Sequence, residues 1–228
     1  MVINDRNNYI IIKRGMNVIY VSKKIGIVSW IVTILYFVIE PIFIMTSLVP
    51  YNMMQQAMSD LGVTTCGKYT YAIAPNEICS PYHFWMNVLF IINGLSFSVG
   101  ILYLSQYLEK NLINKLATVC ILIFALGNSV SGVIPADVHL FWHSILAQIG
   151  MMTVLIGMGI YAKSLVKGKK WTYSNLIVLI ALLILIGLLF FLPLPAGLLQ
   201  RLYYGVIFVW GMGLTILLRS SEIKPGTQ

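Results

Sequence analysis

Residues 174–192, which read SNLIVLIALLILIGLLFFL, contain no charged residue. As an α-helix this stretch would be about 28 Å long at 1.5 Å per residue, which matches the ~30 Å hydrocarbon core of a bilayer. A helix on the surface of a water-soluble protein needs a polar face, and the residues beyond Asn175 offer none. The stretch therefore predicts a helix that crosses a membrane.

Five further segments have the same character, and the composition agrees with them. Hydrophobic residues make up 59% of the 228 residues and charged residues 10%, whereas soluble domains carry about 25% charged residues. The predicted spans cover residues 25–46, 82–104, 112–134, 138–161, 173–192 and 198–218. The sequence predicts an all-α fold, a polytopic membrane protein built as a bundle of six transmembrane helices.

The basic residues predict the orientation of this bundle. Of 15 lysines and arginines, only Lys68 and Arg201 fall on one side of the predicted spans. Basic residues favour the cytoplasmic side, so both termini are expected in the cytoplasm of a multi-pass protein of the cell (plasma) membrane. This topology accounts for the net charge of +8, and no nucleic-acid partner is expected. Membrane lipids are the expected partners, and the oligomeric state stays open.

The chain divides into three predicted parts. Residues 1–24 form a basic amphipathic cytoplasmic segment, residues 25–218 the transmembrane domain and residues 219–228 a cytoplasmic tail. The first segment could lie on the inner membrane surface as a helix or remain a partly ordered tail. Residues 47–81 form the long outer loop, in which residues 51–61 predict a short interfacial helix that ends at Gly62 and holds Asp60 near the outer mouth of the bundle.

Cysteine usage agrees with this topology. Cys66 and Cys79 both lie in the predicted outer loop, and thiols outside the cytoplasm oxidise. A disulfide that closes the loop is the leading interpretation, with two free thiols or a metal pair as alternatives. Cys120 lies within a predicted span and is expected to be a small buried apolar residue.

Polar residues gather where three predicted spans begin, each after an outer turn that contains proline. The residues are His83 and Asn87, then Asp137, His139 and His143, then Gln200 and Arg201. Polar groups that face lipid are costly, so these side chains are expected to point inward. The sequence predicts that His83, His139, His143 and Arg201 surround one outer cavity at a common depth, with Asp60 within reach.

His139 and His143 are four residues apart, which places them on one face of a regular helix. This spacing suits a general base and its partner, or two ligands of a zinc ion whose third ligand would be Asp60, His83, Asp137 or Glu40. Ordinary hydrogen bonds to neighbours are the plainer interpretation. No cofactor is predicted, and zinc is kept as a minor alternative.

The candidate roles follow from these chemistries. The candidate catalytic residues are His139, His143 and Asp60, and the candidate ligand-binding residues are His83, Asn87, Asp137, Gln200 and Arg201. Arg201 could extend to outer headgroups, pair with Asp60, Asp137 or Glu40, or bind an anion such as a lipid phosphate. Glu40 could be a functional buried carboxyl, a packing residue or an interfacial group.

Several short strings carry a family resemblance. They are Met58-Ser59-Asp60-Leu61-Gly62, Cys79-Ser80-Pro81-Tyr82-His83 with Asn87 and Gly94, Gly132-Val133-Ile134-Pro135 with His139, and Gly197-Leu198-Leu199-Gln200-Arg201-Leu202 with Trp210. In this order they resemble the bacterial and archaeal six-helix membrane family catalogued as domain of unknown function 998, which is distantly similar to Frag/DRAM/Sfk-type membrane proteins. The resemblance covers residues 25–218. It implies six membrane helices and no particular activity.

Three functional hypotheses follow. The leading one is a membrane protein with an outer-leaflet polar pocket that binds a lipid headgroup or a similar amphiphile and could hydrolyse or transfer it. A small transporter or channel is the second, although the inner halves of the predicted helices are nearly bare of polar residues. A structural or regulatory subunit is the third. The sequence leaves open whether the protein is an enzyme.

Overall fold

The structure is a computed structural model that describes residues 20–72, 74, 76–165, 169–191 and 195–220. Its long helices are α1 (Lys23–Met45), α2 (His83–Ser105), α3 (Leu112–Val133), α4 (Ala136–Leu165), α5 (Lys169–Phe191) and α6 (Ala196–Ser220). All six are long and apolar enough to span a membrane, which confirms the predicted fold. Residues 1–19 of the predicted N-terminal segment and the tail beyond residue 220 lie outside the described residues.

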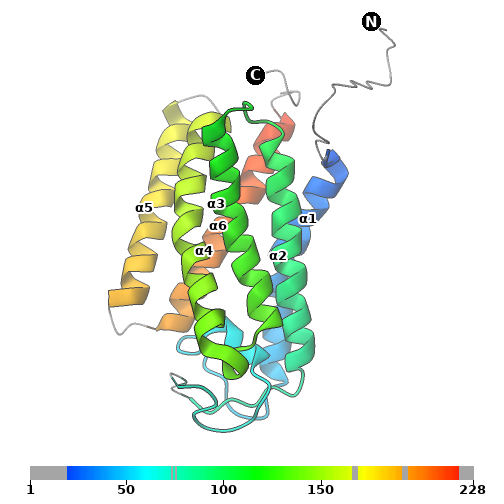
Figure 1. Cartoon of the computed structure of the whole chain (residues 1–228), viewed down its shortest axis with the longest axis vertical. Coiled ribbons are helices and arrows are strands. Elements are labelled where there is room, and N and C mark those ends of the chain that lie inside the picture. Colours follow the sequence, from blue (N-terminus) through cyan, green and yellow to red (C-terminus); the bar gives the residue numbers. More distant parts are fainter. Residues whose placement is uncertain (1–19, 73, 75, 166–168, 192–194, 221–228) are drawn as a thin grey trace, which may run out of the picture.

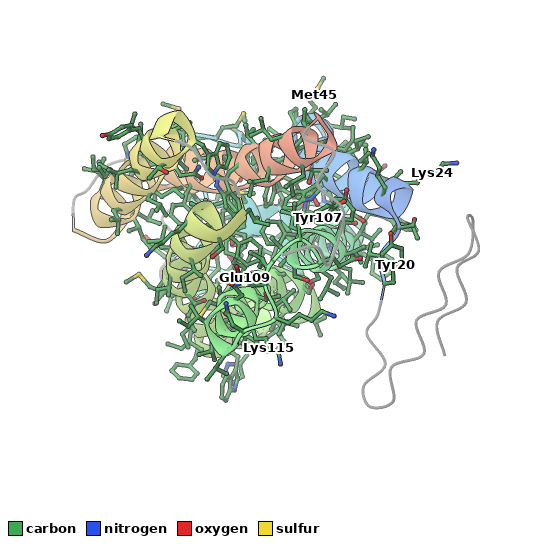
Figure 2. All side chains as sticks on the ribbon, turned by 90° about the horizontal axis from the view of Figure 1, so that it is seen from above. Tyr20, Lys24, Met45, Tyr107, Glu109 and Lys115 are labelled. Carbon is green, nitrogen blue, oxygen red and sulfur yellow. A yellow bond between two sulfur atoms is a disulfide. The ribbon has the colours of Figure 1, made fainter. Side chains whose placement is uncertain are left out.

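The helices form two layers, with α5, α6 and α1 in one and α4, α3 and α2 in the other (Figures 1 and 2). Each helix packs against its neighbours in the chain, and α6 also packs against α1, which closes the ring. The long loop between α1 and α2 covers one end of the bundle, and α1 starts and α6 finishes at the opposite end (Figure 1). Seen from that opposite end, Lys24 and Lys115 point away from the bundle (Figure 2).

Glycines allow the closest helix contacts in the layer of α2, α3 and α4. A Cβ added at Gly94 of α2 would lie 2.6 Å from the Ala125 carbonyl oxygen of α3, and one at Gly150 of α4 would lie 2.8 Å from the Phe124 Cα. These backbones are in direct contact, so small residues are required there.

The outer loop is closed by the Cys66–Cys79 disulfide, as predicted, with a Cα–Cα distance of 4.3 Å. A β-bridge between Gly67 and Ile78 lies beside the disulfide. Ile78 also packs with Val63, Ala74 and Ala136 in a small apolar cluster that joins the loop to the start of α4. The loop is thus a packed cap on one end of the bundle.

The helix predicted over residues 51–61 is wrong in extent. Within this stretch only Met58–Gly62 is helical, as the 3₁₀ helix η1. Before it, local side chains take the backbone groups that a helix would use: the Asn52 amide N–H donates to Gln56 Oε1 at 2.6 Å, and Asn52 Oδ1 accepts from the Met54 N–H at 3.0 Å. Asparagine and glutamine that bond locally in this way compete with helix formation.

Candidate functional site

The arginine in the second turn of α6 is buried and paired with an acidic residue. Arg201 is 8% exposed, and its Nη2 donates to Glu40 Oε1 of α1 at 2.7 Å. Of the alternatives that the sequence leaves open, the structure therefore selects the ion pair with Glu40. A buried charge is tolerated when such a pair is completed by further hydrogen bonds.

Those further bonds go to the outer loop. Arg201 Nη1 donates to the carbonyl oxygens of Met53, Gln56 and Gly197, each at 2.9 Å. Nη2 also donates to the Tyr51 hydroxyl at 2.9 Å, which in turn donates to the Ala57 carbonyl at 2.7 Å. The guanidinium thus fastens the loop to α1 and α6, and both of its terminal nitrogens are engaged by protein acceptors.

A separate pocket of about 310 Å³ lies between the first half of α4, the start of α6, the end of α5 and the loop. Its polar lining residues are Ser59, Tyr71, His143, Ser144, Gln148 and Gln200. Alanine, leucine and methionine side chains form the rest of the wall. Concave sites with a few polar groups in a mainly apolar wall are typical of small-molecule binding.

His143 is held in this wall in a defined tautomer. It is 7% exposed, and its Nδ1 lies 2.8 Å from the Ile134 carbonyl oxygen. A carbonyl oxygen can only accept a hydrogen bond, so Nδ1 carries a proton, and whenever the ring is neutral its Nε2 is an acceptor. His143 can therefore accept a hydrogen bond from a ligand, or serve as a base.

Gln200 of α6 lines the same pocket and can donate where His143 accepts. Its Oε1 accepts from the Met58 backbone N–H at 2.9 Å, which fixes the amide against η1. The Gln200 Nε2 group and the Ser59 and Ser144 hydroxyls take no part in the hydrogen bonds seen among the described residues. The pocket thus offers both donors and acceptors to a ligand.

Asp60 lies behind the pocket wall. The Tyr71 hydroxyl donates to Asp60 Oδ1 at 2.6 Å, and Asp60 is 1% exposed. Burial raises the pKa of the Asp60 carboxyl to about 6, while the hydrogen bond from Tyr71 opposes the shift. Because Tyr71 lines the pocket and Asp60 does not, the carboxyl orients Tyr71; its predicted catalytic role remains a prediction.

Asp137 and Asn87 hold the loop against the helices. Asp137 Oδ2 accepts from the backbone N–H and hydroxyl groups of both Thr64 and Thr65 at 2.7–3.1 Å. Asn87 Nδ2 of α2 donates to the Gly62 carbonyl at 2.9 Å. Both residues fix the loop that forms one wall of the pocket, and neither lines the pocket itself.

The prediction that His139 and His143 share a helix face is wrong. His139 has non-helical dihedral angles (φ −156°, ψ 85°), so the first turn of α4 is separated from the helix that follows. His139 is exposed while His143 is buried. His83 is half-buried, and its Nδ1 donates to the Ser80 carbonyl at 3.0 Å.

The structure does not bring the four predicted residues to one cavity. Of His83, His139, His143 and Arg201, only His143 lines this pocket, where it is joined by Gln200. No group of three or more His, Cys, Asp or Glu side chains in the described part of the chain could hold a metal ion. The zinc alternative has no support among these residues.

Exposed aromatic pairs lie near the starts of α2 and α4. Phe84 and Trp85 of α2 form an edge-to-face pair at 5.2 Å between ring centroids, and Phe141 and Trp142 of α4 form another at 5.2 Å. Aromatic residues of this kind gather where a membrane meets water. His143 follows Trp142 directly and lines the pocket, so the pocket and this aromatic pair lie at the same end of α4.

Four of the polar lining residues were not among the sequence-based candidates: Ser59, Tyr71, Ser144 and Gln148. Gln148 could have been selected from the sequence, because a glutamine within an apolar membrane helix is costly unless it has a polar neighbour. Tyr71 belongs to an irregular loop without periodicity, and only the folded loop brings it to the pocket.

A family model described as a protein of unknown function, DUF998, matches residues 30–217. The chain belongs to the DUF998 family. The DUF998 match includes Glu40, the outer loop, the pocket and Arg201, so the whole site lies inside the family region. No curated protein and no solved structure matches the chain.

Proposed function

We propose that this DUF998 membrane protein binds a lipid headgroup or a similar amphiphile in the pocket between α4, α6 and the outer loop. One observation carries the proposal: the pocket combines an available His143 Nε2 and Gln200 amide with an apolar wall at the level of the interfacial aromatic pairs. A ligand that matches these surroundings has a polar end and an apolar end.

The orientation belongs to the same proposal. Lysines in α1, in the α2–α3 connection and near the end of α4 favour the cytoplasm for the end of the bundle away from the loop. The disulfide favours an oxidising compartment for the loop. The pocket then faces the outer leaflet of the cell membrane, with both termini in the cytoplasm.

A catalytic version of the proposal uses the same histidine. If the bound lipid is hydrolysed or transferred, the neutral His143 with Nδ1 bonded to the Ile134 carbonyl is the general base, because Nε2 lacks a proton.

Transport through the bundle is less favoured than binding. The central amides satisfy one another, since Asn128 Nδ2 donates to Asn93 Oδ1 at 2.6 Å and Asn93 Nδ2 donates to the Thr33 carbonyl at 2.8 Å.

A matched pair of histidine variants tests the binding proposal. The protein is placed in phosphatidylcholine nanodiscs doped with two single-chain probes, monooleoylglycerol and monooleoyl phosphatidylglycerol, and retained probe is counted by native mass spectrometry. We expect His143→Phe to lower retention of at least one probe about tenfold, which corresponds to one lost hydrogen bond in a dry site. His139→Phe, at an exposed position, should retain as much probe as the parent.

Two results would overturn the proposal. One is retention of neither probe by the parent protein above the level of a matched control membrane protein. The other is an equal loss in both histidine variants, because the exposed His139 is outside the pocket.

A further inference from the structure

An apolar groove of about 570 Å³ runs along α4 and α5 next to the pocket. It is lined by Ile145, Ile149 and Met152 of α4 and by Ile186 and Gly187 of α5. Gln148 of α4 lines both the groove and the pocket. The two hollows therefore adjoin at this residue.

The groove has the length and the opening that an acyl chain needs. Its α4 residues extend from Ile145 to Thr153, about 12 Å at 1.5 Å per residue, which is most of the ~15 Å depth of one leaflet. Ile149 is 44% exposed and Met152 is 55% exposed. Because this surface lies in the hydrocarbon layer, a chain can enter sideways from the bilayer.

The chemistry of the pocket limits the headgroup. Besides the neutral His143, none of the residues that line it is acidic or basic. The nearest cation on α6, Arg201, is balanced by Glu40, and the Asp137 carboxylate is engaged by Thr64 and Thr65. A phosphate in such a pocket would lack a counter-charge, and an unpaired buried charge is costly.

We infer that the ligand is a single-chain lipid with an uncharged, hydroxyl-bearing headgroup, of the monoacylglycerol class. This inference rests on the proposed function. The headgroup hydroxyls donate to His143 Nε2 and accept from the Gln200 amide, and the single chain lies in the groove between α4 and α5. One groove beside one pocket accommodates one chain.

Two glycines provide a matched test of the groove as the binding site of the acyl chain. A Cβ added at Gly187 or at Gly213 meets nothing within 4 Å, so both positions accept a side chain without a clash. Gly187→Leu fills the groove, whereas Gly213→Leu adds the same side chain on α6 outside it. Retention in phosphatidylcholine nanodiscs is compared for monooleoylglycerol, monohexanoylglycerol and monooleoyl phosphatidylglycerol.

We expect the parent and Gly213→Leu to retain monooleoylglycerol at least fivefold more than the anionic probe. Gly187→Leu should lose most of this retention and bind the long-chain and short-chain monoacylglycerols equally weakly. A preference for monooleoyl phosphatidylglycerol, with His143 still required, would overturn the uncharged headgroup and leave the proposed function standing. Unchanged retention of monooleoylglycerol by Gly187→Leu would overturn the groove as the site of the acyl chain and would also leave the proposed function standing. If the parent protein bound none of the probes, the proposed function itself would be overturned.

Discussion

Arg201→Met is expected to destabilise the folded protein by about 3–5 kcal/mol, the usual cost of leaving one member of a buried ion pair alone. The substitution leaves Glu40 buried without its partner and removes the donors to the Met53, Gln56 and Gly197 carbonyls. Since folded proteins are stable by only about 5–15 kcal/mol, much of the protein should be lost on mild heating. Size-exclusion chromatography of detergent-solubilised protein after a graded heat step measures the remaining folded fraction.

A double-mutant cycle separates the ion pair from the loop contacts. Glu40→Met together with Arg201→Met should be less destabilising than the sum of the two single variants, because neither charge then remains unpaired. Lys115→Met, at an exposed position near the opposite end, controls for the loss of a positive charge. Additive effects in the cycle would show that the two charges are not coupled and would contradict the pairing.

Asp60 is expected to make stability fall as the pH rises from about 4 to about 6. Its pKa is about 6 in the folded protein against 3.8 for the ordinary group, so the folded state binds the proton more tightly. Below about pH 3 the carboxyl is protonated in both states, so its ionisation does not change the stability there. Through pH 6 the folded protein loses up to about 3 kcal/mol, and the loss is constant at higher pH.

The measurement is the midpoint of thermal unfolding between pH 4 and 8. Asp60→Asn should flatten this profile, since the amide does not ionise and its oxygen still accepts from Tyr71. Glu77→Gln, which changes an exposed carboxyl of the same loop, should keep the parent profile. If Asp60→Asn retains the fall between pH 4 and 6, another group is responsible for it.

The membrane fold could be predicted from the sequence because the length and hydropathy of each spanning segment identify it without reference to the others. The uncharged run over residues 174–192 is a spanning segment on length and hydropathy alone. Pro135 and Pro195 directly precede α4 and α6, and proline is common at the start of a helix. The predicted starts at residues 138 and 198 lie within two residues of the observed ones. The two loop cysteines were expected to pair because the predicted topology places both in one loop outside the cytoplasm, and the structure has this disulfide.

The irregular backbone before η1 has a tertiary cause in addition to the local hydrogen bonds of Asn52 and Gln56. Residues 51–61 have a helical pattern, but Arg201 of α6 takes the carbonyls of Met53 and Gln56. That partner is more than 140 positions away in the chain, so its effect on the local backbone is a tertiary one. A pattern read over a short window contains no information about it.

Only part of the pocket could be predicted from the sequence, because some of its residues come together through tertiary contacts. His143 and Gln200 could be selected because polar residues at the starts of apolar helices are unusual, and both line the pocket. The partnership of His139 with His143 failed because the backbone at His139 leaves the helix. Tyr71 reaches the pocket only through the fold of the disulfide-closed loop, in which it bonds to Asp60.

The central claim is that an amphiphile binds in the pocket with its headgroup against His143 and Gln200. Photo-crosslinking tests it most directly, with a monoacylglycerol that carries a diazirine on its glycerol, in nanodiscs, followed by peptide mapping. The account predicts adducts on the pocket residues Tyr71, Ser144 and Gln200, which excess unlabelled monooleoylglycerol suppresses. Adducts spread over outward-facing residues such as Phe84 and Val209, unaffected by competition, would contradict it.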